Sequence, residues 1–305
     1  MPRKLANVGI VVVVALALAA FWLLTIPDTV PASALAPRIP DLANGKTMFH
    51  AGGCASCHAI PKQEDKTTKL GGGLALGSPF GTFYVPNISS DRSDGIGAWS
   101  EAQFVTAMVK GTSPAGEHLF PAFPYTSYQR MTLDDIRDLF AYLKTLPAVT
   151  GKVRDHALPF PFNIRRTLGL WKFLFLDGRP FMPDFSQSAQ WNRGSYLVNA
   201  PGHCVECHSP RNMLGAVKRN LRFTGGPSPD GKGGVPNITQ QKLKNWTVKD
   251  IADTLTTGMT PDADFVGGSM VEVVRNTSQL TEADREAMAT YIKSLPAAGG
   301  SAPGK

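Results

Sequence analysis

Two short cysteine–histidine motifs carry the chemistry that this sequence can perform. Residues 54–58 read Cys-Ala-Ser-Cys-His, and residues 204–208 read Cys-Val-Glu-Cys-His. The pattern C-x-x-C-H predicts covalent attachment of a c-type haem, in which two thiols form thioethers and the following imidazole binds the iron. We therefore expect two haem c groups, attached through Cys54, Cys57, Cys204 and Cys207, with His58 and His208 as the proximal iron ligands.

Two other kinds of site fit the same residues less well. Paired C-x-x-C motifs of a zinc site usually lie about 15–20 residues apart, whereas these begin at positions 54 and 204, 150 residues apart, and each precedes a histidine. A thioredoxin-like redox pair belongs beside a βαβ pattern, which this sequence lacks. The motifs use all four cysteines of the chain, so none is left for a disulfide.

Length and composition set broad limits. A chain of 305 residues is long enough for two domains and a linker. Its 30 glycines and 24 prolines suit loop-rich domains folded around a large apolar cofactor. The formal net charge is +7, but the lysines and arginines are scattered, which argues against a nucleic-acid-binding protein.

An apolar segment near the N-terminus predicts a membrane anchor. Residues 7–26 are almost wholly apolar, and about 20 such residues cross a bilayer. Arg3 and Lys4 precede the segment and should stay in the cytoplasm, which sends the rest of the chain to the periplasm. A cleaved signal peptide is the alternative, although the segment is long for one and Pro37 follows the best cleavage site. We favour an uncleaved anchor in the bacterial inner membrane.

The rest of the sequence consists of two similar halves. Val-Pro-Asn-Ile-Ser at 85–89 recurs as Val-Pro-Asn-Ile-Thr at 235–239, at the same offset as the cysteines. In each half a Trp-Ser or Trp-Thr pair opens one expected helix, and a second helix closes the half before a proline. No hairpin pattern competes with these helices. We therefore predict an all-α fold with two tandem mono-haem cytochrome c domains.

The predicted organisation has six segments. They are a membrane anchor or signal (1–26), a proline-rich tether (27–41), a first cytochrome c domain (42–147), an inter-domain segment (148–190), a second cytochrome c domain (191–297) and a disordered tail (298–305). The inter-domain segment is too apolar for a free linker, so we expect it to wrap across both domains. Contact with a membrane or a partner is the alternative for its most apolar part, around residues 168–176.

The sixth iron ligand separates an electron carrier from a haem that binds small molecules. In the second half we expect this ligand to be Met270, which follows a flexible stretch and precedes the last helix; Met259 is the fallback. Alignment of the halves on Trp99 and Trp246 places Met270 opposite Phe123, which cannot bind iron. The first haem therefore needs another ligand.

Met131, just before the last helix of the first half, is our preferred ligand for the first haem. Its alternative role is core packing, because its counterpart in the second half is Leu280. Glu206, inside the second motif, is expected to face solvent. Other candidates with usable lone pairs are His118, Tyr125 and Tyr128.

Longer segments carry a family resemblance. Residues 71–89, 118–131, 191–198 and 264–280, among others, resemble the membrane-bound cytochrome c subunits of bacterial periplasmic alcohol and gluconate (sugar) dehydrogenases and their dihaem relatives. The resemblance implies a flavin, quinoprotein or molybdenum dehydrogenase as electron donor, and quinone or another cytochrome as acceptor. The alcohol dehydrogenase cytochromes differ in having three C-x-x-C-H domains and, commonly, methionine where this chain has Phe123.

From these observations we expect a membrane-anchored periplasmic dihaem cytochrome c that transfers electrons and catalyses no bond chemistry itself. The alternative is a haem enzyme, either a peroxidase or a thiosulfate-type oxidoreductase, that uses an open or weakly ligated first haem.

Overall fold

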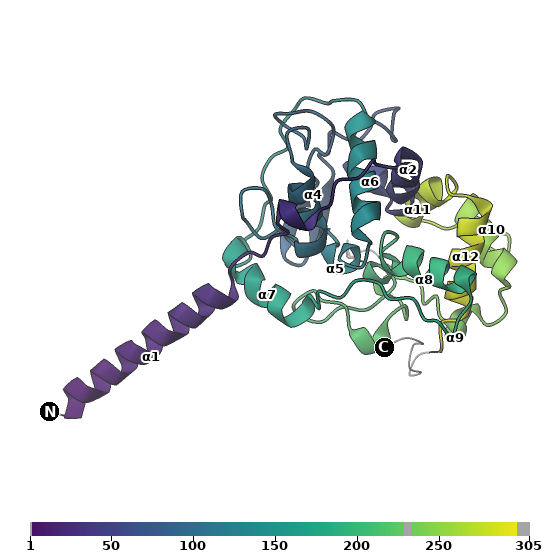
Figure 1. The fold of residues 1–305 in the computed structure, drawn as a ribbon. Coiled ribbons are helices and arrows are strands. Elements are labelled where there is room, and N and C mark those ends of the chain that lie inside the picture. The colour runs from purple at the N-terminus through teal and green to yellow at the C-terminus, as the bar shows by residue number, and fades with distance from the viewer. Residues whose placement is uncertain (1, 229–232, 298–305) are drawn as a thin grey trace.

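A long N-terminal helix projects from a body built of two helical units (Figure 1). The computed structural model describes residues 2–228 and 233–297, so the tail predicted at 298–305 lies outside the described residues. The projecting helix is α1 (Pro2–Leu24). Its window Ala6–Leu24 is long and apolar enough to cross a bilayer, with a mean hydropathy of 2.5.

The first unit runs in the order of helix, motif, loop, helix and long terminal helix, and the last two are the helices that the sequence predicts. Ser100 and Gln103 form a capping box at the start of its middle helix, and Gly111 ends that helix in a left-handed conformation. After the short turn η1 (Ala32–Ala34), its elements are α2 (Leu42–Ala51), α3 (Cys54–His58), β1 (Ala75–Ser78), β2 (Gly81–Tyr84), α4 (Glu101–Lys110), α5 (Tyr125–Tyr128) and α6 (Leu133–Thr145).

The second unit repeats this design. Thr247 and Asp250 form the matching capping box, and Gly258 is the matching left-handed cap. Its elements are α8 (Ala189–Asn199), η3 (Cys204–Glu206), η4 (Arg219–Leu221), β3 (Gly226–Pro227), β4 (Gly234–Val235), α9 (Gln240–Leu243), α10 (Val248–Thr257), α11 (Met270–Thr277) and α12 (Glu282–Lys293).

The first and last helices of each unit cross at a glycine. In the first unit α2 packs on α6, and a Cβ atom on Gly45 would lie 2.2 Å from the carbonyl oxygen of Asp138. In the second unit α8 packs on α12, and a Cβ on Gly194 would lie 1.8 Å from the carbonyl oxygen of Ala287. The absence of a side chain therefore lets each helix pair approach closely enough to form one wall of the core.

Two small hairpins correct the expectation that hairpins are absent. Strands β1 and β2 pair antiparallel, from Ala75 opposite Tyr84 to Ser78 opposite Gly81, and β3 pairs with β4 over two residues. The turn of the first hairpin uses Gly81 at a φ of 115°, which other residues adopt only with strain. These strands have only two to four residues, so they are too short to show the alternation that predicts a strand. The fold is nevertheless mostly helical.

The inter-domain segment contacts both units. It contains η2 (Arg165–Thr167) and α7 (Leu168–Phe175). Against the first unit, Ala157 exchanges two backbone hydrogen bonds of 2.9 Å with Thr82. Against the second unit, the indole Nε1 of Trp171 donates to the carbonyl oxygen of Leu214 at 2.8 Å.

Candidate haem sites

Each C-x-x-C-H motif lies on a short helical turn directly after the first helix of its unit. The residue before the motif has a left-handed conformation in both units: Gly53 has a φ of 55° and His203 a φ of 39°. This turn separates the motif from the preceding helix. In helical geometry residues three positions apart share a face, so the two cysteines of each motif point to the same side. None of the four cysteines forms a disulfide.

The motif histidines have matching partners. Nδ1 of His58 lies 2.8 Å from the carbonyl oxygen of Pro86, and Nδ1 of His208 lies 2.8 Å from that of Pro236. A carbonyl oxygen only accepts hydrogen bonds, so Nδ1 carries the proton and Nε2 keeps its lone pair for a metal. Both prolines belong to the repeated Val-Pro-Asn-Ile segment, which therefore has a structural role that spacing alone did not reveal.

The charge state of these rings fits metal binding as well. Loss of hydration lowers the pKa of His58 to about 4, and the same cause lowers the pKa of His208. Both rings are therefore neutral near pH 7, which is the form that binds iron. Among the described residues, no cluster of three or more His, Cys, Asp or Glu side chains could hold a metal ion by itself. The residues therefore fit two attached haems better than a zinc centre.

The segments that carry Phe123 and the proposed sixth ligand Met270 have a common register in the two units. Isolated bridges join Thr112 to His118 and Met259 to Phe265. Both residues of the second bridge lie 147 positions after those of the first (259 − 112 and 265 − 118), and the same offset places Met270 opposite residue 123. Met270 is the first residue of α11 and packs partly buried against the core.

In the first unit this place is filled by aromatic rings. Phe123 packs against Tyr128 with ring centroids 5.4 Å apart. Burial raises the pKa of Tyr128 well above its ordinary value, and Cys54 and Cys57 add to the effect. Tyr128 therefore lies near the first motif as a neutral phenol, which is a weak iron ligand.

Met131 has the location of a core residue. Its side chain is 2% exposed, and its backbone N–H donates to the carbonyl oxygen of Tyr128 at 2.9 Å. Leu280 makes the corresponding bond to Thr277 at 3.1 Å and is also buried. Iron ligation by Met131 therefore stays a prediction. Leu280, at the corresponding position of the second unit, is a core residue.

The two remaining candidates are held elsewhere. Nε2 of His118 lies 2.9 Å from the carbonyl oxygen of Thr25, just after α1. Tyr125 is fully buried, with its ring directly against Gly111 at the end of α4. These contacts give both side chains structural roles.

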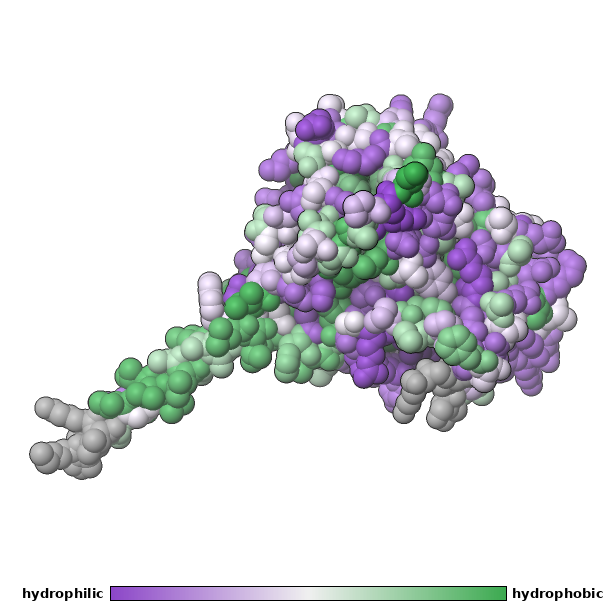
Figure 2. Space-filling view, in the orientation of Figure 1, coloured by the Kyte–Doolittle hydropathy of each residue, from purple (hydrophilic) through white to green (hydrophobic). Residues whose placement is uncertain are grey.

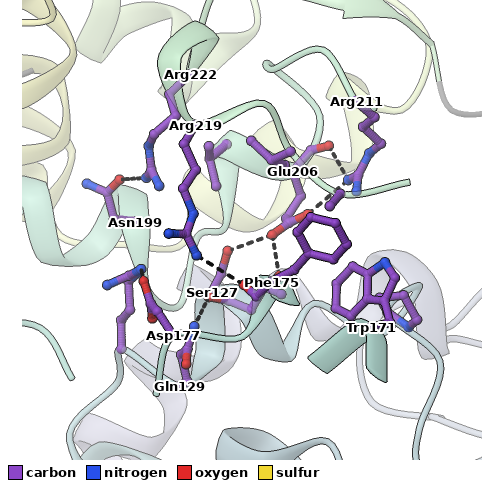
Figure 3. A pocket seen from close by; sticks show the side chains of 16 residues that line it. Ser127, Gln129, Trp171, Phe175, Asp177, Asn199, Glu206, Arg211, Arg219 and Arg222 are labelled. Carbon is purple, nitrogen blue, oxygen red and sulfur yellow. Dashed lines mark hydrogen bonds and ion pairs between the residues drawn. The ribbon is translucent and has the colours of Figure 1, made fainter. Parts of the chain in front are cut away.

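The two motifs pack reciprocally on the opposite unit. Ser56 Oγ donates to the carbonyl oxygen of Glu272 at 3.3 Å and accepts from Asn276 Nδ2 at 2.9 Å, both on α11. Glu206 holds the equivalent position in the second motif, and it accepts from the hydroxyls of Thr126 at 2.7 Å and Ser127 at 3.1 Å on α5 (Figure 3). Each motif therefore contacts the helix that begins at or just after residue 270 or 123 of the other unit.

The burial of Glu206 overturns the expectation that it faces solvent. It is 9% exposed, and Arg211 Nη2 donates to its carboxylate at 2.9 Å, so its charge is compensated. It lines a cavity of about 60 Å³ between the units, together with Trp171 and the arginines Arg219 and Arg222 (Figure 3). Sequence reasoning missed this role because its partners on α5 lie some 80 residues away.

The fold and the sites together define a class of protein: paired helical units that each attach a haem through a C-x-x-C-H motif. A cytochrome c family model matches residues 42–147 and 192–296. The chain therefore belongs to the cytochrome c family, and it carries two covalently bound haem c groups.

Known relatives confirm the resemblance seen in the sequence. The chain is 44% identical over 296 residues to a dihaem cytochrome c-type protein of Cereibacter sphaeroides, covering 97% of this chain and 99% of that protein. It is 37% identical over 275 residues to the fructose dehydrogenase cytochrome subunit of Gluconobacter japonicus, covering 88% of this chain. It is 32% identical over 263 residues to the alcohol dehydrogenase (quinone) cytochrome c subunit of Gluconacetobacter polyoxogenes, covering 83% of this chain. The chain spans 55% of each of these two subunits.

Proposed function

We propose that this protein relays electrons from a partner dehydrogenase to quinone or another cytochrome, on the periplasmic side of the bacterial inner membrane. Similarity to cytochrome subunits of fructose and alcohol dehydrogenases supports the kind of donor. A haem iron held by two axial ligands supplies reversible one-electron transfer. The chain itself provides the attachment, the axial ligands and the spacing of the two sites.

We assign each residue a role at its site. Cys54 and Cys57 hold the first haem, and Cys204 and Cys207 hold the second. His58 and His208 are the proximal ligands, Met270 is the distal ligand of the second haem, and Met131 is the candidate for the first.

The observation that supports electron transfer between the two sites is the reciprocal packing of the motifs. Ser56 on the first motif contacts α11, and Glu206 on the second contacts α5. The cysteines that would hold the two haems therefore lie close to the interface between the units. Electrons can pass from one site to the other there without crossing a full domain.

We further propose that α1 anchors the protein. Its apolar window Ala6–Leu24 has no residue buried in the body, and the basic residues Arg3 and Lys4 precede it. This arrangement favours a helix that spans the bilayer with its N-terminus in the cytoplasm.

Purification of the tagged full chain from its native membrane in mild detergent tests the proposed relay. We expect a flavin, quinoprotein or molybdenum dehydrogenase to co-purify in stoichiometric amount and to reduce both haems when its substrate is added. A co-purified dehydrogenase that leaves the haems oxidised would contradict the proposal.

One observation favours a second function. Phe123 occupies the position that corresponds to Met270, and a phenylalanine side chain cannot bind iron. If Met131 does not bind the iron either, the first haem would be open to small molecules. A peroxidase or a thiosulfate-type oxidoreductase would use such a site. Purification as a lone cytochrome that binds carbon monoxide at the first haem would favour this function.

A further inference from the structure

Helix α7 is fixed to the body by its inner face. Gly169 packs directly on Thr25, since a Cβ atom there would lie 2.6 Å from the Cα of Thr25. Nζ of Lys172 donates to the carbonyl oxygens of Lys110 at 2.6 Å and Gly111 at 2.5 Å, at the end of α4. These contacts hold the helix in one orientation.

The outer face of α7 is apolar and uncovered. Leu170, Phe173 and Leu174 are 36%, 66% and 58% exposed, and their i, i+3, i+4 spacing places them on one face of the helix. Earlier in the inter-domain segment, Phe160 is 78% exposed as well. Without a covering partner, these large apolar side chains would stay in contact with water, which is unfavourable.

This face lies where α1 meets the body. Arg166, just before α7, donates from Nη2 to the carbonyl oxygen of Trp22 at 2.8 Å and from Nε to Thr25 Oγ1 at 2.7 Å. Its guanidinium also lies 4.1 Å from the centre of the Trp22 ring. Figure 2 shows the apolar surface of α1 continuing onto the base of the body, where Figure 1 places α7.

We propose that α7 is an interfacial helix that inserts Leu170, Phe173 and Leu174 into the bilayer crossed by α1. The inference rests on the proposed anchoring role of α1. The apolar span of α1 ends at Leu24, and α7 packs against the residue after it, so the exposed face of α7 lies at the level of the membrane surface. Trp22 and Arg166 form the kind of aromatic and cationic pair that suits the headgroup region.

Lipid is the occupant that the surroundings favour. The face is continuous with a helix proposed to lie in lipid, and it combines large apolar side chains with the neighbouring cations Arg165 and Arg166, the pattern of helices that lie in a membrane interface. A second attachment beside α1 would add to the contacts that already join the end of α1 to the body, and would limit tilting of the body about that point. It would thereby fix the height and tilt of both haem sites above the membrane.

Site-directed spin labelling of the full haem-loaded chain tests this inference. The label is placed at Phe173→Cys in vesicles of phosphatidylcholine and phosphatidylglycerol, with Leu174→Cys as a second variant; haem attachment occupies the native cysteines. Val13→Cys on α1 reports on the anchor, and Lys249→Cys, whose parent side chain is 81% exposed on α10, reports on water. Collisions with oxygen and with a water-soluble nickel chelate are compared by electron paramagnetic resonance.

We expect the label at 173 or 174 to collide several-fold more often with oxygen, relative to the chelate, than the label at 249 does. Equal ratios at 173, 174 and 249, with the label at 13 shielded from the chelate, would overturn the interfacial role of α7 and leave the anchor intact. Access of the chelate to the label at 13 would instead refute the anchor, and the inference with it. An unchanged haem content per chain shows that each variant is folded.

Discussion

The carbonyl oxygens of Pro86 and Pro236 each orient the histidine of a haem motif. By accepting a hydrogen bond of 2.8 Å from Nδ1, each fixes the tautomer that leaves Nε2 free for iron. The proximal chemistry of the two sites is therefore the same. The proposed distal ligands differ, because Met270 in the second unit corresponds to Phe123 in the first, and axial ligands tune the potential of a haem.

At this scale, replacement of Met270 by alanine tests the assignment of the second site. Loss of a thioether ligand removes a group that stabilises reduced iron, so we expect the midpoint potential of one haem to fall by roughly 100 mV within the ~0.8 V range that axial ligands span. Carbon monoxide should bind to one more haem per chain than in the wild type.

Spectroelectrochemical titration measures the first effect and carbon monoxide difference spectra the second. Met213→Ala is the matched control, because Met213 is 94% exposed. Wild-type potentials and wild-type carbon monoxide stoichiometry in Met270→Ala would exclude Met270 as the ligand.

At the scale of elements, the helix pairs α2–α6 and α8–α12 frame the two units. Both crossings depend on a glycine whose Cβ would meet the backbone of the partner helix, Gly45 at Asp138 and Gly194 at Ala287. A backbone atom cannot move aside as a flexible side chain can, so the whole helix would have to shift. The capping boxes at Ser100 and Thr247 are local interactions, unlike these helix crossings, because each joins residues three positions apart in the sequence.

Gly194→Ala should therefore destabilise the protein. We expect the free energy of unfolding to fall by about 2–3 kcal/mol, the usual cost of overpacking a tight contact. Guanidinium denaturation followed by far-UV circular dichroism measures the change. Gly77→Ala is the control, because a Cβ at Gly77 would meet no atom within 4 Å. Equal midpoints for the two variants would show that α8 and α12 are not in close contact.

At the scale of the whole molecule, the two units meet through the third residue of each motif. Ser56 and Glu206 both bond to the opposite unit, but only Glu206 carries a charge. That carboxylate is compensated by Arg211 and by the hydroxyls of Thr126 and Ser127. The inter-domain segment reinforces the arrangement, since Trp171 on α7 bonds to Leu214 in the second unit.

We expect Glu206→Ala to loosen this interface. The change removes the carboxylate that accepts from Arg211 and from the two hydroxyls, although Arg211 keeps backbone acceptors at positions 206 and 215. Hydrogen bonds to a charged group are each worth about 1.5–3 kcal/mol, so we expect the free energy of unfolding to fall by at least about 2 kcal/mol. Limited proteolysis should also cut residues 148–190 faster than in the wild type. The control is Glu286→Ala, which removes an exposed carboxylate on α12. The same unfolding free energy and cleavage rate in both variants would contradict the proposed contact.

The sequence alone was enough to predict the two attachment motifs, the repeat of helical units and the apolar N-terminal helix. These features are local: C-x-x-C-H fixes its own spacing, and caps and periodicity act within a few residues. The match of Met270 with Phe123 also followed from the repeat. Local patterns therefore determined the class of cofactor and most of the helical framework.

Tertiary structure alone decided how the units meet. The bond between Ser56 and Asn276 joins residues 220 positions apart, and the burial of Glu206 depends on α5 of the other unit. The hairpins escaped prediction because their strands have only two to four residues, too few to show an alternating pattern. The exposed face of α7 beside α1 likewise exists only once the chain has folded, because which side chains remain uncovered depends on the fit of whole surfaces and not on residue order.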